Sequence, residues 1–205
     1  MKFKICGLRD FENTKVISVL NPDYMGFIFW EKSLRHVNNP TPSLSINIKK
    51  TGVFVDASFD YIKNKIKEHK LQAVQLHGKE TPDYCDSINE LGVEIIKAFN
   101  VHDDFDFKKL KSYEKNCDFY LFDSKGRLPG GNGFSFDWTV LKNYPHKKPF
   151  FLSGGIGLKS INEIHNLIKY DLPIYAIDVN SKFESIPGFK KINELTQFKK
   201  KLYEL

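Results

Sequence analysis

Eight short apolar runs recur along the chain, separated by longer polar or amphipathic stretches. Each run is four to six residues long and rich in aromatic or β-branched side chains, as buried strands are. The runs are FKIC (3–6), YMGFIF (24–29), KTGVFV (50–55), AVQL (73–76), VEIIKA (93–98), FYLF (119–122), PFFL (149–152) and IYAID (174–178).

The stretches between most of these runs have the apolar spacing of amphipathic helices. One of them opens with Thr81 as a predicted N-cap and Pro82 at the first helical position. The interval 30–49 contains NNPTPS and is predicted to be a loop. The predicted helices cover residues 11–20, 58–69, 81–91, 158–169 and 191–205.

Strands that alternate with helices indicate right-handed βα units and a parallel sheet. Eight such units close into a (β/α)8 TIM barrel, and 205 residues lie near the lower end of the size range of that fold. The alternative is an open, doubly wound sheet, which usually has fewer strands. Because no linker or shift in composition divides the chain, we predict one domain over residues 1–205.

Polar and titratable residues follow the predicted strands, at the end where a barrel of this class carries its chemistry. The opposite ends of the runs have no comparable set. The residues at or after the strand ends are Cys6, Gly7, Ser33, Arg35, Asp56, Gln75, His77, Gly78, Asp123, Ser124, Ser153, Gly154, Gly155, Asp178, Asn180 and Ser181.

The composition excludes some classes of protein. No run approaches the roughly 18 apolar residues of a membrane helix, and the first ten residues lack the apolar core of a signal peptide. Three cysteines without paired or metal-type spacing suit a reducing cytoplasm and make a zinc site improbable. The net charge of +6 comes from scattered lysines, so we expect neither a nucleic-acid nor a membrane partner.

Nine motifs, in order along the chain, resemble those of the phosphoribosylanthranilate isomerase family. They extend over nearly the whole sequence, so together they are far more specific than any one of them. The motifs are KICGLRD (4–10), GFIF (26–29), SLRHV (33–37), GVFVD (52–56), VQLHGKE (74–80), GGNGFSFDW (130–138), LSGGI (152–156), DVNS (178–181) and ESIPGFKK (184–191).

The resemblance implies a (β/α)8 barrel that acts in tryptophan biosynthesis with neither a metal nor an organic cofactor. The implied reaction is an Amadori rearrangement of N-(5-phosphoribosyl)anthranilate to 1-(2-carboxyphenylamino)-1-deoxyribulose 5-phosphate. In the implied mechanism, Asp123 is the general acid that opens the sugar ring and Cys6 the general base that removes the C2′ proton. The partner is a small phosphosugar, and the resemblance leaves a monomer and a homodimer both open.

Both catalytic roles set physical conditions. Cys6 must be partly thiolate, and we expect Lys4, two residues away on the same strand face, to lower the pKa of the thiol. Asp123 must carry a proton when it acts, and the preceding FYLF run supplies an apolar setting. Without the resemblance, Cys6 alone would be read as a small buried hydrophobe, as Cys85 and Cys117 are.

We predict where the substrate's charged groups bind. Arg35 suits the anthranilate carboxylate, because a guanidinium group pairs with a carboxylate through two hydrogen bonds. The loops after the last two strands are the usual phosphate site of the barrel. The predicted phosphate-binding residues are Gly154, Gly155, Asn180 and Ser181, and the other predicted substrate-binding residues are Gln75, His77 and Asp178.

Several alternatives stay open at this point. Gln75 and His77 either contact substrate or brace neighbouring loops, and Arg35 either binds substrate or is a surface charge. Another phosphosugar enzyme of the same barrel is the rival activity, and a basic binding module is the rival from another class. Two residues depart from the family's pattern. Lys182 stands where glycine is usual and Lys191 where an acidic residue is usual.

Overall fold

The computed structural model describes residues 1–124 and 138–205, in which eight parallel strands close into a barrel. Each strand pairs with the next along the chain, and β8 pairs with β1 through four residue positions, so the sheet has no open edge. The strands are β1 (Lys2–Ile5), β2 (Tyr24–Ile28), β3 (Lys49–Phe54), β4 (Ala73–Leu76), β5 (Glu94–Val101), β6 (Phe119–Ser124), β7 (Phe150–Leu152) and β8 (Ile174–Val179). The predicted barrel is confirmed, and the open-sheet alternative is wrong.

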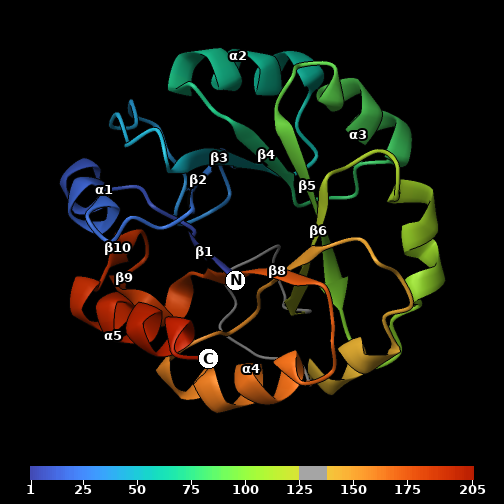
Figure 1. Ribbon diagram of the computed structural model, residues 1–205. Coiled ribbons are helices and arrows are strands. Elements are labelled where there is room, and N and C mark those ends of the chain that lie inside the picture. The colour runs from blue at the N-terminus through green and yellow to red at the C-terminus, as the bar shows by residue number, and fades with distance from the viewer. Residues whose placement is uncertain (125–137) are drawn as a thin grey trace.

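Helices form a ring outside the strands (Figure 1). Thr81 caps its helix as predicted, accepting from the backbone N–H of Tyr84, and the loop predicted over 30–49 is confirmed as far as β3. The connections after β5 and β6 contain only 3-10 helices among the described residues. The helices are α1 (Phe11–Ser18), α2 (Phe59–His69), α3 (Pro82–Asn89), η1 (Phe107–Tyr113), η2 (Trp138–Asn143), η3 (Leu158–Ser160), α4 (Ile161–Ile168), η4 (Ser181–Phe183) and α5 (Ile192–Tyr203).

A short hairpin, absent from the sequence prediction, follows the last barrel strand. Its strands are β9 (Glu184–Ile186) and β10 (Phe189–Lys190), joined through Gly188 with a positive φ of 87°. β10 packs against α1, so the hairpin lies beside the first helix of the barrel (Figure 1). The chain therefore brings residues 184–190 close to the loop after β1.

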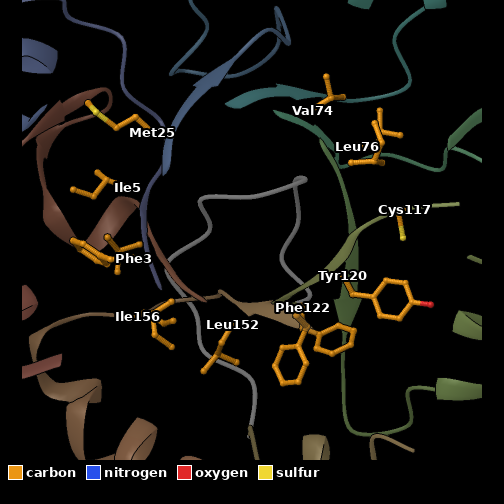
Figure 2. Packing of buried hydrophobic residues seen from close by; sticks show 14 of the residues in the cluster. Phe3, Ile5, Met25, Val74, Leu76, Cys117, Tyr120, Phe122, Leu152 and Ile156 are labelled. Atoms are coloured by element: carbon orange, nitrogen blue, oxygen red, sulfur yellow. The ribbon is translucent and has the colours of Figure 1, made fainter. Parts of the chain in front are cut away.

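The alternation of side chains along the strands divides the core into two clusters. Phe3 and Ile5 of β1, Tyr120 and Phe122 of β6, and similar residues on the other strands point outward into the helix layer (Figure 2). The residues between them point into the barrel. This inner cluster consists of Tyr24, Ala73, Ile96, Ala98, Leu121, Phe151 and Ala176.

Polar side chains continue the inner face of the same strands toward their carboxyl ends. Asp123 follows Leu121 by two residues, and Asp178 follows Ala176 by two, so each lies on the barrel side one layer above an apolar residue. Above the apolar inner cluster, the carboxyl end of the barrel is thus lined by polar side chains, and this end holds the candidate site.

Candidate active site

Five of the predicted site residues lie together inside the carboxyl end of the barrel. Cys6, Gln75, His77, Asp123 and Asp178 are all buried, each at most 8 % exposed. They come from β1, β4, β6 and β8 or from the residue that directly follows the strand. Strand parity explains this convergence, because residues two apart on a strand share one face.

Two glycines make room for Cys6 and its loop. A Cβ on Gly26, the glycine of the neighbouring β2, would lie only 2.6 Å from the sulfur of Cys6. Gly7 has a φ of 74°, and a Cβ there would collide with the side chains of Asn180 and Arg35. The Cys-Gly pair after β1 therefore places a thiol in the barrel and lets two other loops approach it closely.

Lys4 is the central cation of the site and is fully buried. Its Nζ lies 3.0 Å from Oδ2 of Asp178 and donates a hydrogen bond of 2.7 Å to Oε1 of Gln75. Burial works to lower the pKa of Lys4, but Asp178 and Cys6 outweigh it and the pKa is raised. Lys4 is therefore a permanent positive charge in the barrel.

The pKa of the Cys6 thiol is shifted in the direction opposite to the one predicted from the sequence. Burial raises the pKa of Cys6, and the cations Lys4 and Lys190 lower it by less than burial and Asp178 raise it. The expectation that Lys4 would bring the pKa of Cys6 below its ordinary value is thus wrong for the unliganded site. The direction of the Lys4 effect was correct, but the cost of burying a thiolate is larger.

A chain of polar contacts leads from Lys4 across the barrel to Asp123. The amide nitrogen of Gln75 lies 2.6 Å from Nδ1 of His77, and Nε2 of His77 lies 3.3 Å from Oδ2 of Asp123. The last contact is close but lacks the geometry of a hydrogen bond. Both ends of the Gln75 amide are occupied by protein side chains, so the structure favours bracing over direct substrate contact for this residue.

Asp178 is only partly satisfied by the protein. Burial raises the pKa of its carboxyl group, Lys4 counteracts this, and neighbouring Asp123 adds to the increase. Oδ2 faces Lys4 at 3.0 Å and accepts from the hydroxyl of Ser153 at 3.4 Å. Oδ1 is buried and has no hydrogen-bond partner within residues 1–124 and 138–205. A buried carboxylate oxygen without a partner is costly, and a ligand hydroxyl would satisfy it.

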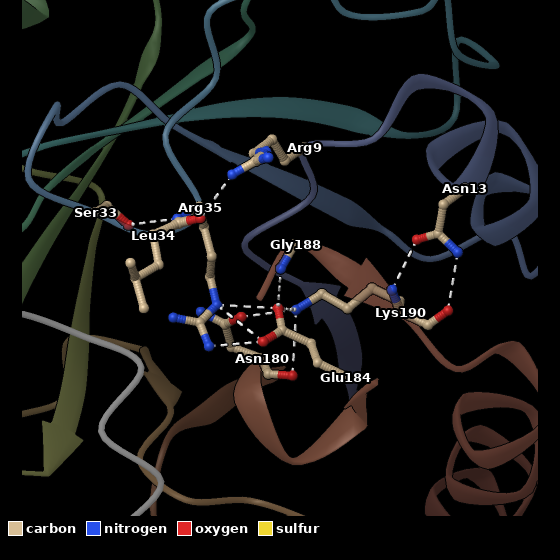
Figure 3. A network of polar contacts seen from close by, with 9 residues as sticks. All are labelled: Arg9, Asn13, Ser33, Leu34, Arg35, Asn180, Glu184, Gly188 and Lys190. Atoms are coloured by element: carbon tan, nitrogen blue, oxygen red, sulfur yellow. Dashed lines mark hydrogen bonds and ion pairs between the residues drawn. The ribbon is translucent and has the colours of Figure 1, made fainter. Parts of the chain in front are cut away.

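Arg35 belongs to a second polar network, which the sequence prediction missed (Figure 3). Its Nε and Nη2 donate to both carboxylate oxygens of Glu184, at 2.6 to 3.0 Å. Glu184 also accepts from Nζ of Lys190 at 2.6 Å and from the backbone N–H of Gly188 at 3.1 Å. Arg35 is thus held in place by the hairpin after β8 and is not a free surface charge.

Lys190 connects this network to the loop after β8. Its Nζ donates to the backbone oxygen of Asn180 at 3.2 Å and to the side-chain oxygen at 2.7 Å. Burial lowers the pKa of Lys190 to about 8, and Glu184 opposes this. Burial also works to raise the pKa of Glu184, but Arg35 and Lys190 outweigh it, and the pKa falls below its ordinary value. In the sequence, the lysine of ESIPGFK is the residue from which this network could have been suspected.

The four residues predicted to bind phosphate lie in the loops after β7 and β8. Gly154 and Gly155 have φ angles of 92° and 67°, a conformation that glycine adopts without strain. Asn180 directly follows β8, and Ser181 is the first residue of η4. The two loops are adjacent, because a Cβ on Gly157 would lie 3.3 Å from the Cβ of Lys182.

Neither departure from the family's pattern strains the fold. Lys182 has no positive φ, so the left-handed backbone that glycine would favour there is not used. Lys191 occupies the N-cap position of α5 without a side-chain capping hydrogen bond, and its Nζ pairs with Glu194 at 2.9 Å. Most of the motif over 130–138 lies outside the described residues.

A closed (β/α)8 barrel with a buried thiol, two carboxyl groups and an imidazole at its carboxyl end is typical of an enzyme that acts on a small molecule. Residues 3–201 match the family model for N-(5′-phosphoribosyl)anthranilate (PRA) isomerase. The chain belongs to this family, whose members are aldose–ketose isomerases of tryptophan biosynthesis.

Relatives and solved structures agree with this assignment. The N-(5′-phosphoribosyl)anthranilate isomerase of Parabacteroides distasonis is 38% identical, with 97% of this chain and 91% of the relative covered. That of Campylobacter jejuni is 37% identical, with 98% of both covered. The crystal structure of the Thermotoga maritima enzyme superimposes with a TM-score of 0.84 at 28% identity, over 100% of both chains. A further isomerase structure, solved with reduced 1-(o-carboxyphenylamino)-1-deoxyribulose 5-phosphate, has a TM-score of 0.81 at 27% identity, again over 100% of both.

Two further observations concern the described residues as a whole. Among them, no helix is long and apolar enough to cross a membrane. The same part of the chain contains no group of three histidine, cysteine or acidic side chains arranged to hold a metal ion.

Proposed function

We propose that Cys6 and Asp123 are the general base and the general acid of the family's isomerisation in this chain. The observation that carries the proposal is their arrangement. Both are buried at the carboxyl end of the barrel. Cys6 directly follows β1, Asp123 lies on β6, and β7 and β8 lie between those strands. A substrate lying between them is reached by one group from each side, as acid–base catalysis at two neighbouring atoms requires.

The reaction begins with proton transfer from Asp123 to the ring oxygen of the ribose. The bond between that oxygen and C1′ breaks, and the nitrogen lone pair forms a cationic Schiff base at C1′. Cys6 then removes the proton from C2′, and the electron pair of that bond neutralises the nitrogen and leaves an enolamine. Protonation of C1′ and loss of the proton on the C2′ oxygen give the ketone.

This order of steps reconciles the raised pKa of Cys6 with its role as a base. In the unliganded site the thiol keeps its proton, because burial outweighs Lys4 and Lys190. Ring opening then places a third positive charge, the Schiff base, beside the sulfur. A nearby cation lowers the pKa of a thiol and at the same time makes the C2′ proton more acidic. The thiol therefore releases its own proton to solvent at this stage, and the resulting thiolate takes up the C2′ proton.

Arg35, Asp178 and the four predicted phosphate-binding residues position the substrate. The Nε and Nη2 edge of Arg35 holds Glu184, and Nη1 has no partner in the described part of the chain, which supports Arg35 as the group that binds the anthranilate carboxylate. The unpaired Oδ1 of Asp178 accepts a sugar hydroxyl. The backbones of Gly154 and Gly155, with Asn180 and Ser181, receive the phosphate.

The cellular location and the oligomeric state complete the proposal. The three cysteines are buried and unpaired, which supports the reducing cytoplasm as the location. A monomer and a homodimer are both compatible with the family, since one solved relative is described as monomers generated from a dimeric enzyme.

The test is turnover of freshly generated N-(5-phosphoribosyl)anthranilate, followed by the loss of its anthranilate fluorescence. Cys6→Ala and Asp123→Asn are expected to lower kcat by roughly 10² to 10⁴, the usual contribution of an acid or a base. Cys117→Ser is the matched control, because Cys117 is equally buried but faces the helix layer. No turnover by folded wild-type protein contradicts the proposal, and so does full activity of Cys6→Ala.

A further inference from the structure

The contact between Lys4 and Gln75 fixes which way the Gln75 side chain points. An ammonium group only donates hydrogen bonds, so the atom 2.7 Å from Nζ of Lys4 is the oxygen of the amide. The reverse orientation would put two donors face to face in a site where both residues are at most 1 % exposed. The NH2 group of Gln75 therefore points away from Lys4, toward His77.

The orientation of Gln75 in turn fixes the protonation of His77. The Gln75 nitrogen lies 2.6 Å from Nδ1 of His77, and because this nitrogen is a donor, Nδ1 is the acceptor. An imidazole that accepts at Nδ1 is neutral and carries its single proton on Nε2. An imidazolium, or the other neutral tautomer, would have an N–H at Nδ1 directed at the amide donor.

We propose that Lys4 and Gln75 are positioning residues that hold His77 as the neutral imidazole with its proton on Nε2, the atom 3.3 Å from Oδ2 of Asp123. The inference rests on the proposed function, in which Asp123 is the general acid. Lys4 can only donate hydrogen bonds, so it fixes which end of the Gln75 amide accepts and which end donates. The Gln75 donor in turn fixes which nitrogen of His77 carries the proton.

This arrangement suits a carboxyl group that must first hold and then release a proton. When Asp123 protonates the ring oxygen it becomes a carboxylate, and the Nε2–H of His77 is close enough to donate to it, since apo contacts of this kind tighten during the reaction. An imidazolium would favour the carboxylate form of Asp123 before the reaction and so remove the acid. A neutral donor supports the product state without that cost.

The experiment reads the tautomer directly, from the ¹⁵N resonances of the imidazole nitrogens in histidine-labelled protein at neutral pH without substrate. A His77→Asn variant assigns the His77 signals. Gln75→Glu replaces the donor at Nδ1 by an acceptor, so His77 is expected to change to a form with a proton on Nδ1. Gln75→Met removes the hydrogen bond with little change in volume and is expected to give a mixture of tautomers. His69, buried outside the barrel beside Thr41, is the internal reference that stays unchanged.

Turnover by the same variants tests the role of the tautomer. We expect Gln75→Glu to lower kcat by roughly ten- to a hundredfold, part of the range of acid–base catalysis, with a smaller change in KM. Wild-type His77 that is cationic, or protonated on Nδ1, overturns the proposal. Retention of the pure Nε2–H form in Gln75→Glu or Gln75→Met also overturns it, as does unchanged kcat with an altered tautomer. The ¹⁵N spectrum needs no substrate, so absence of wild-type turnover refutes the proposed function alone.

Discussion

Of the buried lysine–carboxylate pairs near the carboxyl end of the barrel, two have the same nitrogen–oxygen distance of 3.0 Å. Lys4 and Asp178 face the interior. Lys97 and Glu80 lie on the outer side of the sheet, because Lys97 alternates with the inward-facing Ile96 and Ala98. The two pairs are alike in burial and length, but their remaining hydrogen-bonding groups are used very differently.

The outer pair is saturated by the protein. Nζ of Lys97 donates to Glu80 and lies within 3.2 Å of three backbone oxygens, those of Leu76, Gly78 and Ala98. Glu80 accepts in turn from the backbone N–H groups of Asp56 and Gly78. Every strong donor and acceptor of this pair has a partner, so the pair holds the loop after β4 and leaves nothing for a ligand.

The inner pair is left incomplete. Asp178 keeps a buried oxygen without a partner in the described residues, and its pKa is raised, mainly by burial. A native protein tolerates such a group where a ligand completes it, which is why perturbed titratable groups collect at functional sites. The comparison shows that burial alone does not distinguish a structural ion pair from a functional one. The distinguishing feature is whether the hydrogen-bonding groups of the pair are left without partners in the protein.

The largest expected effect is on stability, at the saturated pair. Lys97→Met leaves Glu80 buried without its cation and three carbonyl oxygens without their donor, and we expect the free energy of unfolding to fall by about 3–5 kcal/mol. Lys4→Met is expected to cost less, because the raised pKa of Asp178 lets that carboxyl group take up a proton. Urea unfolding at neutral pH measures both.

A second substitution checks the cause of this loss. Adding Glu80→Gln to Lys97→Met removes the unpaired charge but keeps an oxygen for the backbone donors, and part of the lost stability is expected to return. If Lys97→Met and Lys4→Met were equally stable, this would contradict the claim that the outer pair contributes more to stability than the inner pair.

The Arg35–Glu184 pair lies between these two cases in its use of hydrogen bonds. Glu184 is saturated, while Nη1 of Arg35 has no partner in the described residues and is the atom we propose for the substrate carboxylate. Glu184→Gln is expected to raise KM about tenfold, equivalent to roughly 1.4 kcal/mol, since the guanidinium loses the charge that orients it. A substrate analogue without the ring carboxylate supplies the control, as its KM should not respond to the substitution. Equal increases in KM for both compounds would show that Glu184 only supports the fold.

The smallest expected effect concerns Cys6 and pH. Because burial raises the pKa of this thiol in the folded state, the unfolded chain releases its proton first, above about pH 8.5. Folding stability that depends on the thiol is therefore lost as pH rises, by at most about 1.4 kcal/mol per pH unit relative to Cys6→Ser. Urea unfolding of both proteins between neutral and alkaline pH measures the difference. If the stability of the wild type increased relative to that of Cys6→Ser as the pH rises, Cys6 would be a thiolate in the unliganded site.

The sequence was sufficient to predict the elements that depend on local pattern. The eight apolar runs became the eight barrel strands, and the residues after them converged at one end because parallel strands all end there. Cys6, Gln75, His77, Asp123 and Asp178 were placed together on this argument alone. Barrel closure was the part that periodicity could not decide, because it depends on the pairing of β8 with β1.

The features that were missed depend on distant partners. The hairpin after β8 is short, and its Glu184 and Lys190 acquire their roles only by meeting Arg35 from the loop after β2. The pKa of Cys6 was predicted in the wrong direction, because a neighbouring lysine is visible in the sequence while the extent of burial is not. The saturated pair went unnoticed for the same reason, since Lys97 stands in a strand whose outer face is otherwise apolar.

The most direct test of the division between the two pairs is the turnover of Lys4→Met and Lys97→Met, measured side by side on N-(5-phosphoribosyl)anthranilate and expressed per folded molecule. We expect Lys4→Met to lose about a hundredfold or more in kcat, because it removes the cation beside both Cys6 and the Gln75–His77–Asp123 chain. Lys97→Met, in its folded fraction, should stay within about fivefold of wild type, a difference of roughly 1 kcal/mol. Full activity in Lys4→Met, or equal losses in both variants, would contradict the account.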